Sequence, residues 1–150
     1  GGTHYLGSQS YEYSYYNYNG KSINGSTQST YGNTYTTGDI IGIALDLDNS
    51  KLYFSKNGTF QNSGDPTSGA SGTGALSITA VESTQNGFYY VGAGDYSSAN
   101  ATTYIWNFGQ EGTFAGNTTA GGNSDGNGVG NFKYSVPSGY LALCTKNLGS

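Results

Sequence analysis

Carboxylates are the side chains of this sequence that could bind a metal ion or act in acid–base catalysis, and two of them are closely spaced. Asp46 and Asp48 lie on one face of an expected strand, about 7 Å apart from the rise per residue. Such a pair could bind Ca²⁺ or hydrolyse a glycosidic bond, but hydrolysis also needs a carboxyl group whose pKa is raised within a cleft. The neighbouring residues supply no such setting, so we interpret the pair as a solvated strand face that leads into a turn.

Three other features with chemical potential do not form a catalytic or metal site. Asp125-Gly126-Asn127-Gly128 lacks the bidentate Glu of an EF-hand, and we expect it to be a flexible loop. His4 is the single histidine and has no nucleophile motif nearby, and we interpret Cys144 as a small buried hydrophobe. The sequence therefore predicts a non-catalytic protein with no metal site and no cofactor.

Tyrosine is the residue type that most favours a binding function, with 15 copies. We expect four of them to be exposed among Asn, Ser and Thr: Tyr16, Tyr18, Tyr31 and Tyr35. Exposed tyrosines with short polar neighbours form adaptable binding surfaces that lose little entropy on binding, and their rings can stack on sugars. We take these four as ligand-binding candidates. The alternative, which the sequence leaves open, is that they pack in the core or against a neighbouring subunit.

The charge of the chain and the length of its apolar runs exclude two classes of partner. The chain has 150 residues, a net charge of −4 and five basic residues, all of them Lys. Without arginine forks or a basic patch, it lacks the groups that neutralise phosphates, so we expect no nucleic-acid partner. No apolar run approaches the roughly 20 residues that cross a bilayer, so we expect no membrane insertion.

Most of the secondary structure that the sequence predicts, and that must position these side chains, is β-strand. Residues 40–48 alternate between apolar and small or polar types, residues 52–56 form a second run, and Asn57-Gly58 is typical of a tight hairpin turn. These residues predict an antiparallel meander. Further strands are expected at 11–18, 74–82, 88–93, 102–108 and 140–144, and long loops at 62–74 and 115–131. The expected core side chains are Ile41, Ile43, Leu45, Leu47, Leu52, Phe54 and Phe108.

Four motifs in order give the chain a resemblance to the SPRY family, the core of the larger B30.2 domain. They are Ser10-Tyr11-Glu12-Tyr13, the block from Tyr31-Gly32 through Gly38-Asp39-Ile40-Ile41-Gly42 to Leu45-Asp46-Leu47-Asp48, Phe54-Ser55-Lys56-Asn57-Gly58, and Trp106-Asn107-Phe108-Gly109 with Phe114. The resemblance implies an all-β, antiparallel β-sandwich of the concanavalin-like jelly-roll type, with Tyr11 and Tyr13 in the core. The family's opening strands should precede Ser10, so we expect the domain to be truncated at its N-terminus.

The C-terminal run suggests a setting for this domain. Residues 132–148 resemble a tail that follows SPRY domains in virion proteins of phages and environmental viruses. The expected organisation is a SPRY-like sandwich at 1–114, a Gly/Asn-rich insertion at 115–131, and a C-terminal strand or tail at 132–150 that packs on the sandwich or links onward.

These observations lead to a functional hypothesis and two alternatives. The hypothesis is a non-catalytic module of a virion surface protein, such as a tail fibre, appendage or capsid decoration, that recognises a host glycan or protein. The first alternative is a purely structural subunit that packs against its neighbours in a virion or extracellular filament. A glycan-degrading enzyme is the third. Expected partners are other virion or filament subunits, through homo-oligomerisation or a strand-completing segment.

Overall fold

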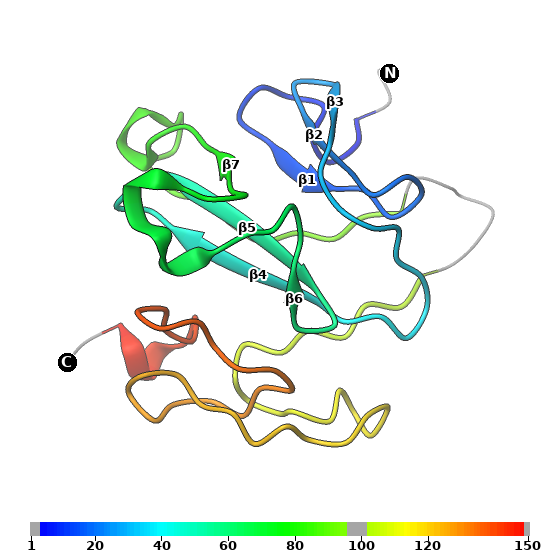
Figure 1. Ribbon diagram of the computed structural model, residues 1–150, viewed down its shortest axis with the longest axis vertical. Coiled ribbons are helices and arrows are strands. Elements are labelled where there is room, and N and C mark those ends of the chain that lie inside the picture. Colours follow the sequence, from blue (N-terminus) through cyan, green and yellow to red (C-terminus); the bar gives the residue numbers. More distant parts are fainter. Residues whose placement is uncertain (1–3, 96–101, 149–150) are drawn as a thin grey trace.

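The protein folds into two antiparallel β-sheets with little helix. The computed structural model describes residues 4–95 and 102–148. One sheet has the order β1-β2-β3, and the second has the order β4-β5-β6 with β7 paired to β5 (Figure 1). The first sheet comprises β1 (Tyr13–Tyr15), β2 (Lys21–Asn24) and β3 (Thr27–Thr30). The second comprises β4 (Ile41–Asp46), β5 (Lys51–Lys56), β6 (Thr59–Phe60) and β7 (Leu76–Ser77). The predicted all-β antiparallel sandwich is confirmed.

The meander from β4 to β6 forms where the sequence predicted it. Ile41 pairs with Lys56 and Leu45 pairs with Leu52 across β4 and β5. Asn57 and Gly58 both have a positive φ, 50° and 83°, and they reverse the chain into β6. A hairpin turn of this kind needs two left-handed residues, and Asn followed by Gly reaches that region at low cost.

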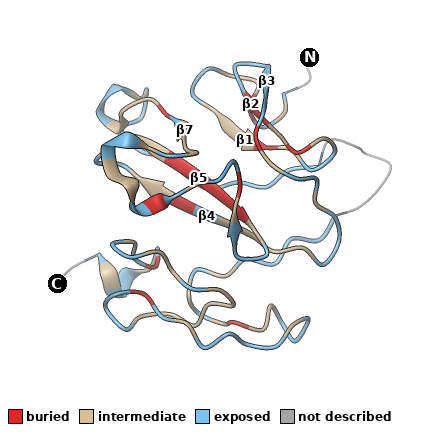
Figure 2. Ribbon diagram, viewed as in Figure 1, coloured by how far each residue is buried: buried red, intermediate tan, exposed pale blue. Residues whose placement is uncertain are grey.

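An aromatic core lies between the two sheets. The Tyr15 ring from β1 meets Phe54 of β5 with ring centroids 5.7 Å apart, and Tyr31 contacts both in edge-on arrangements. Leu52 and Ile78 complete the buried cluster, and the partly buried Ile41 and Leu45 pack against it. Figure 2 shows a continuous run of buried residues along β5 and further buried residues in the first sheet. Large rings therefore compensate for the small number of aliphatic side chains.

Three of the seven predicted core residues are exposed. Ile43 is 42% exposed, because the core cluster packs against Ile41 and Leu45 but not against the residue between them. Leu47 is exposed because β4 ends at Asp46 and leaves it in the turn. Phe108 is exposed because it lies outside both sheets, stacked on Trp106. The expectation that these three side chains are core was wrong.

The second face of the β4–β5 sheet is also covered. Tyr53 is fully buried there, beside Ala44 of β4 and in edge-on contact with the Phe60 ring. The C-terminal segment, orange to red in Figure 1, lies on the side of this sheet away from β1–β3. Its Tyr140 hydroxyl donates to the carbonyl of Pro66, in the segment that connects β6 to β7, at 3.1 Å. The protein therefore has a third layer, built from coil.

Several predicted strands are shorter than expected or absent. β1 is only Tyr13–Tyr15, β7 covers only the start of 74–82, and the three later expected strands have no strand assignment in the described residues. Those three segments are 88–93, 102–108 and 140–144. Conversely, β2 and β3 were not predicted, because their sequences are mostly polar and β3 is exposed throughout. The helical elements are short 3-10 turns: η1 (Pro66–Ser71), η2 (Val81–Ser83) and η3 (Thr145–Asn147).

Candidate binding surface

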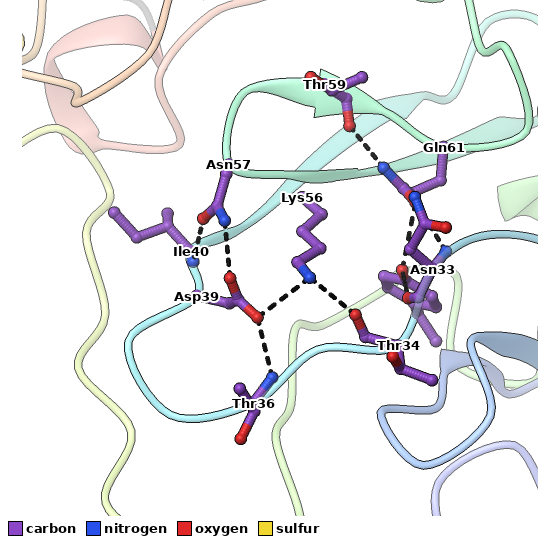
Figure 3. A network of polar contacts seen from close by, with 10 residues as sticks. Asn33, Thr34, Thr36, Asp39, Ile40, Lys56, Asn57, Thr59 and Gln61 are labelled. Carbon is purple, nitrogen blue, oxygen red and sulfur yellow. Dashed lines mark hydrogen bonds and ion pairs between the residues drawn. The ribbon is translucent and has the colours of Figure 1, made fainter.

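Two of the sequence motifs are tied together by one carboxylate. Asp39, which precedes β4, accepts hydrogen bonds from the Thr36 N–H at 2.9 Å and the Asn57 side-chain amide at 2.6 Å, and it pairs with Lys56 at 3.2 Å (Figure 3). These contacts, the Thr36 bond first, lower the pKa of Asp39. The Asn57 side chain in turn accepts the Ile40 N–H at 2.8 Å. Asp39, Lys56 and Asn57 therefore stabilise the entrance to the β4–β5 hairpin.

Gln61 extends this network to the segment after β3. Its buried side-chain oxygen accepts the Asn33 N–H at 2.9 Å, and its amide donates to the Thr59 carbonyl at 2.8 Å (Figure 3). The Tyr15 hydroxyl donates to the Asn33 carbonyl beside it. Gly32 is needed here, because a Cβ atom at this position would lie 2.6 Å from the Gln61 side-chain oxygen. The side chains of Asp39, Lys56, Asn57 and Gln61 thus bond to one another and to nearby backbone groups and hold the two motifs together.

Tyr31 and Tyr35 have structural roles. Tyr31 is only 3% exposed, so the expectation that it lies on the surface was wrong. Its hydroxyl accepts the Phe54 N–H at 2.9 Å, and burial raises its pKa to about 12. Tyr35 is half-buried, donates to the Tyr15 carbonyl at 2.7 Å, and has its pKa raised to about 12, again by burial. Neither hydroxyl is free in this structure.

Tyr16 and Tyr18 lie together on the turn between β1 and β2. Tyr18 is 79% exposed, Tyr16 is partly exposed, and their ring centroids are 6.2 Å apart. Two backbone hydrogen bonds close the turn, from the Tyr16 N–H to the Lys21 carbonyl and from the Gly20 N–H to the Tyr16 carbonyl. The structure therefore brings together two of the four candidate tyrosines, on a turn with a defined backbone.

The turn is also anchored to its surroundings. The Asn19 side chain accepts the Lys21 N–H at 3.1 Å and donates to Gln28 of β3 at 2.9 Å. Gly20 has a φ of 69° and packs so closely on the Gly32 carbonyl that an added Cβ would lie 2.2 Å from it. Both tyrosine rings are thus presented from a fixed backbone, which reduces the entropy lost on binding.

Other exposed aromatic side chains were not among the predicted binding residues. They are Tyr11, Phe88, Tyr90, Tyr104, Trp106 and Phe108. Trp106 and Phe108 stack in parallel, with centroids 5.8 Å apart. Residues 102–108 were expected to form a strand with Phe108 in the core, and this interpretation concealed the exposure of both rings.

Of the two closely spaced carboxylates, Asp46 has a local partner in Asn49. Asp46 accepts the Asn49 N–H at 2.9 Å and so caps the β4–β5 turn, and Asp48 follows it on the exposed surface. The His4 ring lies 3.4 Å from the Ser8 hydroxyl, on the exposed surface. Among the described residues, no group of three His, Cys, Asp or Glu side chains could hold a metal ion. No helix in the same part of the chain is long and apolar enough to cross a membrane.

Asp125 is an internal organiser of the C-terminal layer. It is buried and accepts hydrogen bonds from the N–H groups of Asn127, Val129 and Ala142, all within 2.9 Å, and from the Asn147 side chain at 2.7 Å. Burial raises the pKa of this carboxyl, but the hydrogen bonds outweigh it and lower the pKa to about 2. The loop we expected to be flexible is therefore centred on a buried, hydrogen-bonded carboxylate, a feature that the Gly-rich sequence concealed.

Comparison with known proteins agrees with this description of the fold. Residues 1–89 match the SPRY domain family, a region that includes both sheets and the Asp39 and Gln61 network. No curated protein matches the chain. SPRY domains generally mediate protein–protein interaction, so the chain carries a binding module. Because the match covers more than half of its length, the chain belongs to the SPRY family.

Proposed function

We propose that this SPRY domain is a non-catalytic binding module on the surface of a virus particle, in a tail fibre, appendage or capsid decoration. It recognises a host glycan or protein through the turn that carries Tyr16 and Tyr18. The observation that carries the proposal is this pair of neighbouring rings, Tyr18 exposed and Tyr16 partly exposed, on a hydrogen-bonded turn. Binding, and not catalysis, is also supported by the polar motif residues, which are engaged with one another.

The chemistry of the turn suits both classes of ligand. Each tyrosine offers a flat apolar ring and a hydroxyl, and Asn17 and Asn19 flank Tyr18 with amide groups. Rings of this kind stack on sugars or fill apolar depressions of a protein, while amides and hydroxyls satisfy polar groups at the rim. Because the backbone of the turn is fixed before binding, little of the interaction free energy is lost in ordering it.

The virion setting is supported by the C-terminal segment. Residues 132–148, which resemble a tail found after SPRY domains of virion proteins, pack against the sandwich in this structure through Tyr134 beside Gly58 and Tyr140 beside Pro66. Sandwich and tail thus form one unit. Immunogold labelling of native particles with an antibody against this chain tests the setting: label on intact particles supports it, and label confined to host cell material contradicts it.

Binding experiments with four tyrosine variants test the role of the turn. The chain is screened against a glycan array and against a library of displayed host-surface proteins. For a ligand that binds, Tyr18→Ala is expected to remove about 2 kcal/mol, about thirty-fold in Kd, as a central aromatic contact does. Tyr18→Phe keeps the ring and should retain most of the affinity.

The matched control is Tyr90→Ala, which removes an equally exposed tyrosine from another part of the surface. It should leave the affinity unchanged. A ligand that binds the wild-type chain and the Tyr16→Ala/Tyr18→Ala double variant equally well would contradict the proposal, and loss with Tyr90→Ala instead would move the site elsewhere.

A further inference from the structure

The segment 102–108 has the composition of a strand but no strand neighbour in the described part of the chain. It reads Thr-Thr-Tyr-Ile-Trp-Asn-Phe, and aromatic and β-branched residues of this kind favour a sheet. Three consecutive side chains are exposed, Tyr104, Ile105 and Trp106. Among the described residues, no backbone group of 102–108 forms a hydrogen bond with another backbone group.

One edge of this segment is occupied by a side chain. Gln110 accepts the Phe108 N–H at 2.6 Å and donates to the Trp106 carbonyl at 2.7 Å. These two backbone groups belong to residues two apart and point to the same side, as the groups of an extended strand do. The Gln110 carboxamide thus takes the place that a peptide group of a neighbouring strand would fill. It blocks pairing at this edge.

The opposite edge is open. In an extended chain the backbone groups of Thr103, Ile105 and Asn107 alternate with those of Trp106 and Phe108 and so face the side away from Gln110. No hydrogen bond of these backbone groups occurs among the described residues. None of the usual protections against edge pairing is present, since the segment contains no Lys, no Pro and no inward charge. An edge of this kind pairs readily with another strand.

We propose that a second copy of this chain pairs with that edge, antiparallel and centred on Ile105. In this register Ile105 faces Ile105 of the second copy, and Tyr104 lies across from Trp106, an aromatic pair that stabilises neighbouring strands. The sequence contains no charged residue between Asp95 and Glu111, so two copies meet here without bringing like charges together despite their net charge of −4. The edge pairs with the same segment of the second copy, so both sides of the contact have the same composition, as a two-fold interface requires.

Gln110 also sets the size of the assembly. With one edge blocked and one open, each copy can pair once, and the product is a closed dimer. Removal of the Gln110 side chain opens a second edge, which allows each copy to pair twice and the assembly to grow. This inference goes beyond the proposed function, because it concerns contacts between copies and not the turn at Tyr16 and Tyr18.

Sedimentation of the chain and four variants, over micromolar to submillimolar concentrations, tests the pairing. The wild-type chain is expected to be a dimer. Ile105→Pro removes the central N–H, and Ile105→Lys places like charges opposite each other, so both should be monomeric. Tyr90→Lys adds the same charge at an exposed aromatic elsewhere and should remain dimeric. Gln110→Ala should form species larger than a dimer.

Backbone hydrogen exchange keeps the test decisive if a variant unfolds. In the wild-type chain, the protection of the Ile105 amide against hydrogen exchange should rise with protein concentration. The exchange rate of the Tyr18 amide should not change with protein concentration. A wild-type monomer at every concentration overturns the proposal. So does a dimer that persists in both folded Ile105 variants, which would place the contact at another surface, or a dimer without protection at Ile105, which would indicate a different partner for the edge.

Discussion

Removing one buried hydroxyl tests the packing of the two sheets most closely. β6 pairs with Ser55 and Lys56, and β7 pairs with Lys51 and Leu52, so neither strand reaches the N–H of Phe54. The Tyr31 hydroxyl fills this gap at 2.9 Å. Tyr31→Phe keeps the ring but leaves the buried N–H without its acceptor.

The expected loss follows from this geometry. A buried backbone donor that loses its partner costs about 1–3 kcal/mol of the free energy of unfolding. For a chain of this length each kcal/mol lowers Tm by about 2–4 °C, so Tyr31→Phe should melt about 2–12 °C below the wild-type protein.

Urea denaturation followed by circular dichroism measures this loss. Tyr18→Phe is the matched control, since it removes a hydroxyl from an exposed ring and should change stability by less than about 0.5 kcal/mol. If the two variants are equally stable, the hydroxyl of Tyr31 does not hold the Phe54 N–H, and the account of how the first sheet docks on β5 is wrong.

Three further perturbations test the core and the ionisable groups. Leu52→Ala, at a buried position, should lower the free energy of unfolding by about 2–5 kcal/mol in urea denaturation. Ile43→Ala, at an exposed position, should lower it clearly less. Equal losses would show that the buried and exposed faces of the β4–β5 sheet are assigned wrongly. Because the pKa of Asp125 is lowered to about 2, its contribution to stability is present above pH 4 and is lost as pH falls toward 2. Hydrogen exchange of the C-terminal amides should therefore become faster over this pH range in the wild-type chain. The change with pH should be much smaller in Asp125→Asn. Because the pKa of Tyr31 is raised to about 12, its contribution is present below pH 10 and is lost as pH rises through 12, and tyrosinate absorbance at pH 11 should be lower in the folded than in the unfolded chain.

The sequence predicted the centre of the fold well because its signals there are local. The alternation of residues 40–48 and the Asn57-Gly58 turn define β4, β5 and the start of β6 without reference to the rest of the chain. β2 was missed because it is mostly polar, so the apolar alternation that marks a strand is absent, although it pairs with its chain neighbours β1 and β3. Tyr53 was missed because alternation assumes one buried face, and this sheet is covered on both.

The exposure of the four candidate tyrosines was predicted in part. A tyrosine has an apolar ring and a polar hydroxyl, so its type does not tell whether it is buried. Tyr31 is buried because the Phe54 N–H offers its hydroxyl a partner, whereas Tyr18 lies on a turn beyond the reach of either sheet. Asp125 was underestimated because two of its four hydrogen-bond donors, Ala142 and Asn147, lie far along the chain.

Imaging at side-chain resolution of the virus particle in which we propose that this domain lies tests the central claim most directly. The claim is that this SPRY domain binds a ligand through the turn of Tyr16 and Tyr18. The account predicts that the turn faces solvent in the assembled particle, with both rings free and with density for a host ligand over them when the ligand is added. A turn covered by a neighbouring subunit would contradict this claim and show that the tyrosines serve assembly instead.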